Sequence, residues 1–188
     1  MRIVSLLLLV LVSGSLQGCF PIAAAGMGTG AMVSQDRRTS GAYVEDEAIE
    51  NKAVNRIGKQ FNDTVHVNVT SFNRIVLISG EAPGEAVKTE IGRMVSGIEN
   101  VRSVNNELAV SGLSSLTSRS GDGMITANVK IRFVNDQRFH ADHVKVVTEN
   151  GTVFLMGIVK HAEADAATEV TSTTKGVQRV VKLFEYLD

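Results

Sequence analysis

The sequence predicts an α+β fold made of two tandem copies of one small domain, each with the element order αββαβ. The main observation is internal repetition: 73–80 and 150–157 lie 77 positions apart, and each has an asparagine corner, a four-residue apolar run and a glycine. A second motif recurs at 97–101 and 176–180, as Gly-Ile-Glu-Asn-Val and Gly-Val-Gln-Arg-Val. Repetition at a fixed spacing indicates duplicated structural units.

The repeat and the composition of the remaining segments divide the chain of 188 residues. We expect a signal peptide at 1–18, a flexible Gly- and Ala-rich tether at 19–45, a first domain at 46–110, a Ser-rich linker at 111–120 and a second domain at 121–188. Domains of this size are near the lower limit for folding alone. The two copies are therefore expected to pack on each other.

The N-terminus has the features of an export signal. Arg2 precedes an apolar stretch over 3–12, which is far shorter than the roughly 20 residues that span a bilayer. Gly18-Cys19 resembles the processing site of bacterial lipoproteins, which implies cleavage after Gly18 and a diacylglycerol on the Cys19 sulfur. Phe20, where an aspartate would retain such proteins in the inner membrane, implies sorting to the outer membrane. The alternative is an ordinary signal peptide with a spare cysteine.

The first domain is predicted from its periodicity. Apolar residues at four-residue steps from Asp46 to Phe61 indicate a helix with one buried face, and Asp46 is expected to cap its start. Strict alternation at 65–70 indicates a half-buried strand, and Asn73 suits the corner before the next strand, 75–78. A helix then runs from Pro83 to the glycine stop at residue 97, followed by a last strand at 101–110. Both helices are expected to cover one face of a small three-stranded mixed sheet.

The second domain repeats this order. Asp122 is expected to cap a helix whose buried stripe ends at Phe133, and Asn150-Gly151 is a strong hairpin signal. The strand 153–156 is continuously apolar, so both of its faces should be shielded. Helices can shield only one of them, which is a second reason to expect contact between the domains. A helix ending before Gly176 and a strand at 180–187 complete the copy.

The first helix of the second domain carries apolar residues beyond its buried stripe. Three apolar side chains and three neighbouring cations form the candidate binding site: Met124, Ile131, Val134, Lys130, Arg132 and Arg138. In the first copy, Asn55 and Gly58 occupy the places of Ile131 and Val134. Exposed apolar side chains beside cations suit the interface of an anionic membrane. The alternative is that these residues pack against the first domain or the linker.

The αββαβ order, the run 153–157 and the Gly-Val-x-x-Val ending at 176–180 resemble BON domains. With the lipoprotein processing site and the tether, they resemble dual-BON outer-membrane lipoproteins of the DolP/YraP type. The resemblance implies a lipid-anchored protein on the periplasmic face of the outer membrane that supports envelope integrity. It also implies binding of anionic phospholipids through the first helix of the second domain, here 122–135. The competing hypotheses are a scaffold that binds an outer-membrane assembly protein, and a mechanical spacer.

Other function classes find little support in the sequence. The chain has 19 basic and 20 acidic residues, no basic block and no tryptophan, which argues against nucleic-acid binding. His140 and His143 lack further well-spaced ligands, so we predict no metal site. Cys19 is the only cysteine and no G-x-S-x-G motif occurs. We therefore expect neither a cofactor nor an enzymatic activity.

Overall fold

The computed structural model describes residues 36–188. The predicted signal peptide, Cys19 and the tether as far as residue 35 lie outside the described residues. The first copy consists of helix α3 (Ser40–Phe61), the 3-10 turn η1 (Asn62–Thr64), strands β1 (His66–Phe72) and β2 (Ile75–Ala82), helix α4 (Glu85–Ser96), and strands β3 (Ser103–Asn106) and β4 (Ala109–Val110). The predicted last strand is thus interrupted, and Leu108 enters the core at the break.

The second copy has the same order. It consists of helix α5 (Leu116–Asn135), the 3-10 turn η2 (Ala141–His143), strands β5 (Val144–Glu149) and β6 (Thr152–Val159), helix α6 (His161–Ser172) and strand β7 (Arg179–Tyr186). The predicted αββαβ arrangement is confirmed in both copies.

Each copy forms a mixed sheet around its second strand. In the first, β2 pairs antiparallel with β1 and parallel with β3 and β4; in the second, β6 pairs antiparallel with β5 and parallel with β7. The hairpin registers coincide, because Val67 pairs with Gly80 as Val144 pairs with Gly157. A Cβ on Gly80 would lie 2.1 Å from the carbonyl oxygen of His66, and a Cβ on Gly157 would lie 2.3 Å from that of His143. The backbones of the paired strands approach so closely at these two positions that both require glycine.

One face of each sheet is covered by the two helices of its own copy. In the second copy, Val129 and Phe133 of α5 and Ala167 of α6 pack on Val153 and Leu155 of β6. The first copy has the equivalent core between α3, α4 and β2. Alternating residues of a strand point to opposite faces, so the remaining side chains of β2 and β6 point away from these helices.

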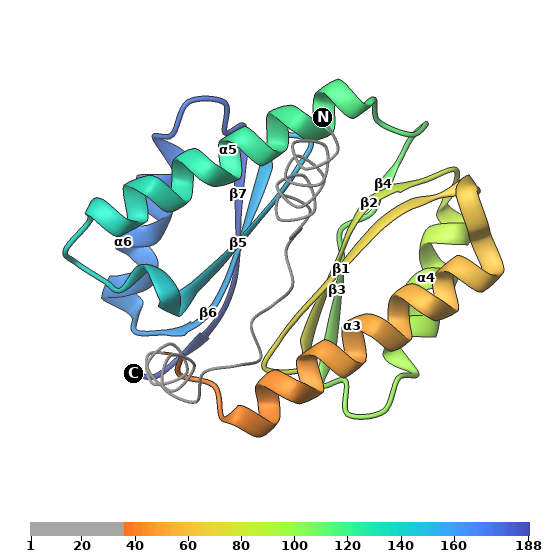
Figure 1. The fold of residues 1–188 in the computed structure, drawn as a ribbon, viewed down its shortest axis with the longest axis horizontal. Coiled ribbons are helices and arrows are strands. Elements are labelled where there is room, and N and C mark those ends of the chain that lie inside the picture. Colours follow the sequence, from red (N-terminus) through yellow and green to blue (C-terminus); the bar gives the residue numbers. More distant parts are fainter. Residues whose placement is uncertain (1–35) are drawn as a thin grey trace, which may run out of the picture. The chain divides into compact units, whose positions relative to one another are not determined.

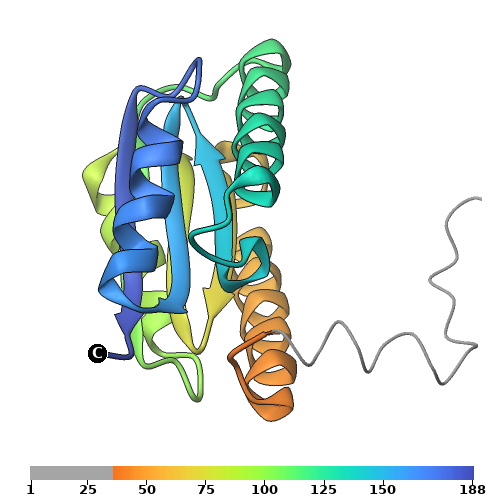
Figure 2. The same ribbon diagram turned by 90° about the vertical axis from the view of Figure 1, so that its left-hand side faces the viewer.

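Those remaining faces bury each other. Phe72 and Leu77 of the first sheet pack with Phe154 and Met156 of the second in a third hydrophobic cluster. Residues 36–188 form one compact unit, in which the layers follow as helices, sheet, sheet and helices (Figures 1 and 2). The predicted contact between the copies is confirmed, and it explains why β6 is apolar on both faces.

The predicted caps of the two long helices are wrong. Helix α3 begins six residues before Asp46, with Thr39 as its N-cap, and α5 begins six residues before Asp122, with Ser115 as its N-cap. Each hydroxyl accepts the backbone N–H three residues on, which satisfies a donor at the helix start. Residues 40–45 and 116–120, expected in the tether and the linker, are therefore helical.

Asp46 and Asp122 are instead buried inside their helices and hold the hairpin corners. The Asp122 carboxylate accepts the backbone N–H groups of Asn150 and Gly151 at 2.8 and 2.9 Å. Asp46 accepts those of Asn73 and Arg74 at 2.8 and 2.7 Å. The residues at the corners, Asn73, Arg74, Asn150 and Gly151, have positive φ, so the carboxylates fix turns whose backbone is intrinsically unfavourable for side-chain-bearing residues.

Candidate functional site

Helix α5 presents a stripe of four apolar side chains to solvent. Its members Leu116, Met124, Ile131 and Val134 have exposed fractions of 81%, 67%, 59% and 74%. At about 100° per residue they share one side of the helix, opposite the buried Asp122 and Phe133. At 1.5 Å per residue the stripe is about 27 Å long. Nothing in the described residues covers it, so the alternative that these side chains pack against the first copy is not what the structure shows.

Leu116 was not among the predicted site residues, because it was assigned to the linker. A signal was nevertheless available: Leu116 precedes Met124 by eight residues and Ile131 by fifteen, which keeps it on the same side of a helix. Ser115 immediately before it is a favourable N-cap. With Leu116, the stripe extends over the whole of α5.

The first copy has no equivalent stripe. The places of Leu116, Met124, Ile131 and Val134 are occupied in α3 by Ser40, Ala48, Asn55 and Gly58. Helix α3 does expose Tyr43, Val44 and Val54 on one side, but none of them stands at a place equivalent to a member of the α5 stripe. The two copies therefore share a core and differ on this outer surface.

The three predicted cations have different surroundings. Arg132 is half-buried and bonded to the end of α6: its Nη1 donates to the Val170 carbonyl at 2.7 Å and to Thr174 Oγ1 at 2.6 Å, and its Nη2 to Thr173 Oγ1 at 2.9 Å. The guanidinium thus satisfies groups at the C-terminal end of α6, where helix carbonyls lack partners.

Arg138 is paired with two carboxylates. Its guanidinium binds Asp136 and donates from Nη1 to Glu169 Oε2 at 2.7 Å. The hydrogen bonds to Asp136, and then that to Glu169, raise the pKa of Arg138. Lys130, in contrast, is exposed on α5, and no ion pair or hydrogen bond involves its ammonium within the described part of the chain. Of the three cations, Lys130 is the one whose charge is available to a ligand.

The histidines that suggested a possible metal site form a ring contact. The His140 and His143 rings meet edge to face with their centroids 5.1 Å apart. Between residues 36 and 188, no group of three His, Cys, Asp or Glu side chains is arranged to hold a metal ion. Among the helices of the same range, none combines the length and the apolar composition needed to cross a bilayer.

Residues 45–112 and 121–188 each match the BON domain family. The outer membrane lipoprotein DolP of Haemophilus influenzae is 39% identical over 92% of this chain and 91% of its own. A 21 kDa hemolysin of Actinobacillus pleuropneumoniae is 33% identical over 81% of this chain and 79% of its own. The osmotically-inducible protein Y of Escherichia coli is 28% identical over 80% and 77%.

Proposed function

Because this chain belongs to the BON-domain family, with two copies over nearly all of residues 45–188, we propose that it is a lipid-anchored outer-membrane protein that binds anionic phospholipids through α5. The observation that carries this proposal is the exposed apolar stripe of α5. Burying four such side chains in the interface of a bilayer removes apolar surface from water, which stabilises attachment. The name of the Haemophilus relative, an outer membrane lipoprotein, supports the location.

The stripe runs along one side of α5 for about 27 Å. A helix lying in the plane of a membrane surface buries a one-sided apolar face of this kind along its whole length.

Charge supplies the preference for anionic lipids. Lys130 stands beside Val134 on the flank of the stripe, and a lysine near an anionic surface contributes about 1 kcal/mol of attraction. Arg132 and Arg138 contribute only their long-range field, because their hydrogen-bonding groups are engaged with α6 and with carboxylates. We therefore expect the chain to bind anionic vesicles and not zwitterionic ones.

A glutamate in the stripe tests the proposal. The chain from residue 20 on, which keeps the compact unit, is mixed with vesicles of phosphatidylglycerol or of phosphatidylcholine and sedimented. We expect binding to the first only, and we expect Ile131→Glu and Leu116→Glu each to weaken it at least about tenfold, since a buried aliphatic side chain is worth about 1.5–3 kcal/mol. The matched control is Asn55→Glu, which places the same charge at the equivalent exposed position of α3.

Full binding by Ile131→Glu, with an unchanged melting temperature, would eliminate α5 as the lipid-binding helix. The competing function, binding of an outer-membrane assembly protein, predicts that the wild-type chain sediments with neither vesicle. It also predicts that a cross-linker placed at Ile131 reacts with such a protein in intact envelopes.

The proposed anchor at Cys19 has its own test. Mass spectrometry of the mature N-terminus is expected to show a diacylglycerol thioether and an acylated amine on this cysteine. Several acyl chains together give nearly permanent attachment. An unmodified cysteine would refute the proposed anchor.

A further inference from the structure

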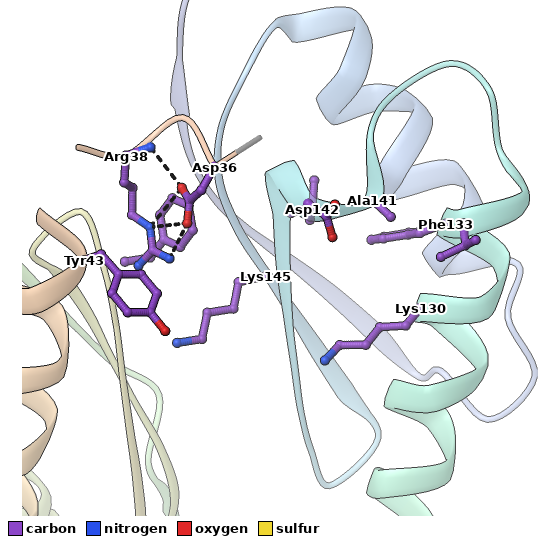
Figure 3. A pocket seen from close by; sticks show the side chains of 11 residues that line it. Asp36, Arg38, Tyr43, Lys130, Phe133, Ala141, Asp142 and Lys145 are labelled. Atoms are coloured by element: carbon purple, nitrogen blue, oxygen red, sulfur yellow. Dashed lines mark hydrogen bonds and ion pairs between the residues drawn. The ribbon is translucent and has the colours of Figure 1, made fainter. Parts of the chain in front are cut away.

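A crevice lies beside the C-terminal half of α5, where the two copies meet. Its volume is about 410 Å³, which is within the usual range for small-ligand sites. Its lining includes the aromatic and aliphatic side chains of Tyr43, Phe72, Phe133 and Val144, which come from both copies. Figure 3 shows the Tyr43 hydroxyl and the ammonium groups of Lys130 and Lys145 directed into the same space. The crevice therefore combines an apolar lining with three hydrogen-bond donors.

The crevice is continuous with the proposed lipid-binding stripe. Val134 is both a member of the stripe and part of the crevice lining. Lys130, one turn earlier on α5, also lines it. A molecule whose apolar part follows the stripe can thus place a polar end in the crevice without crossing a charged barrier.

The charges around the crevice are mostly compensated. Arg38 is bound to the carboxylates of Asp36 and Asp46. The Lys145 ammonium donates to Glu50 Oε1 at 3.2 Å. This bond uses one of the three donors of the ammonium. Asp142 is exposed on the rim. Only Lys130 lacks a carboxylate partner in the described range, so the crevice suits a ligand with one negative charge.

We propose that this crevice binds the phosphodiester of an anionic phospholipid head group, with Tyr43 of the first copy and Lys130 and Lys145 of the second as donors. The proposal rests on the lipid binding proposed above and adds the first copy to it. A phosphodiester carries one charge, whereas a phosphomonoester carries about −1.5 to −2 at neutral pH. We therefore expect phosphatidylglycerol to be preferred to phosphatidic acid, because a second charge would meet Asp36, Glu50 and Asp142.

Three conservative variants test the donors. Lys130→Gln and Lys145→Gln are each expected to weaken binding to phosphatidylglycerol vesicles about fivefold, and Tyr43→Phe between about two- and tenfold. Glutamine at 145 can still donate to Glu50, and phenylalanine at 43 keeps the ring that lies over Arg38, so folding should be preserved. The matched control, Lys175→Gln, removes an exposed lysine elsewhere in the second copy and should leave binding unchanged.

A soluble probe separates the head group from the bilayer. In NMR titrations below the micellar concentration, dihexanoyl phosphatidylglycerol is expected to shift the amide signals of Tyr43 and Lys145, and dihexanoyl phosphatidylcholine is not. The same shifts with inorganic phosphate alone would overturn the lipid assignment in favour of a free-phosphate site. If Tyr43→Phe and Lys145→Gln bind vesicles as tightly as the wild-type chain does, this inference is overturned and the proposed function remains intact. Failure of the wild-type chain to bind any vesicle would overturn both.

Discussion

The guanidinium of Arg37 binds both carboxylate oxygens of Glu163, at 2.6 and 2.8 Å, across 126 positions of sequence. The same guanidinium donates to the Ile158 carbonyl at 2.9 Å. The next residue, Arg38, contacts the first copy instead, through Asp46 and the face of the Phe72 ring. Two consecutive arginines thus join the segment before α3 to both copies.

Arg37→Ala is expected to lower the free energy of unfolding by about 1–2 kcal/mol, because a bidentate, charge-assisted contact is lost. For a chain of this size that corresponds to a fall of about 2–4 °C in melting temperature per kcal/mol. Differential scanning calorimetry measures it. The control is Arg179→Ala, which breaks an exposed pair with Glu107 at 3.4 Å and should change stability by less than about 1 kcal/mol.

The same contact has a pH signature. The hydrogen bonds from Arg37, and then that from the Lys160 backbone N–H, lower the pKa of Glu163 from 4.5 to about 2. A depressed pKa in the folded state stabilises the fold above the unfolded-state pKa, and this contribution is lost as the pH falls toward the folded-state value. The stability difference between wild type and Arg37→Ala should therefore shrink as the pH falls from about 5 to about 2. A constant difference would contradict the assignment.

Phe154→Ala is expected to weaken the contact between the copies more than either core. The ring lies in the cluster shared by the two sheets, and removing a buried phenylalanine costs about 3–5 kcal/mol. We expect urea unfolding followed by circular dichroism to change from one transition to two. Phe133→Ala makes the same deletion inside the second copy's own core and should instead destabilise that copy alone. Identical unfolding curves for the two variants would argue against the shared cluster as the joint.

Asp122→Ala is expected to destabilise the second copy by about 2–4 kcal/mol, because two corner N–H groups lose their acceptor. Asp142→Ala is the control, since this carboxylate is exposed and should matter by less than about 0.5 kcal/mol. Chemical denaturation measures both, and hydrogen exchange at Asn150 and Gly151 should accelerate in the first variant only. Unchanged exchange there would show that the corner is held by other contacts.

Glu149 is expected to oppose stability at neutral pH. Burial raises the pKa of Glu149. Two neighbours act in the opposite direction: Asn68 donates to its carboxylate at 2.9 Å, and His66 Nε2 lies 3.8 Å from its Oε1. A raised pKa in the folded state means that stability is lost as the pH rises through it and the carboxylate ionises. Glu149→Gln should therefore raise the melting temperature at pH 7.5, with the gain disappearing near pH 4. A loss of stability at every pH would show that the charge of Glu149 is needed.

The features that were predictable from the sequence are those with local periodicity. The continuously apolar run from Val153 to Met156 indicates that β6 is buried on both faces, and the repeat of the motifs indicates that both copies have the same element order. The same reasoning placed Met124, Ile131 and Val134 outside the buried stripe of α5. These conclusions depend only on the period of a helix or strand.

The features that escaped prediction depend on contacts between distant residues. Asp46 and Asp122 look like caps in sequence, and their actual partners are corner N–H groups 27 to 29 residues away. Arg132 similarly looked like a surface cation, but its guanidinium reaches Thr174, 42 positions later. No local pattern distinguishes a charged side chain that stabilises the fold from one that can bind a ligand. Only the three-dimensional contacts show that, of the three predicted cations, Lys130 is the one available to a ligand.

The face that joins the two sheets also governs what can be learned from dissecting the chain. A fragment containing only one copy would carry Phe72 and Leu77, or Phe154 and Met156, on an open sheet surface. Such a fragment is expected to pair with itself or to precipitate. Binding assays on single copies would then report the behaviour of an artificial homodimer, so a truncated protein should retain both copies from Asp36 onward.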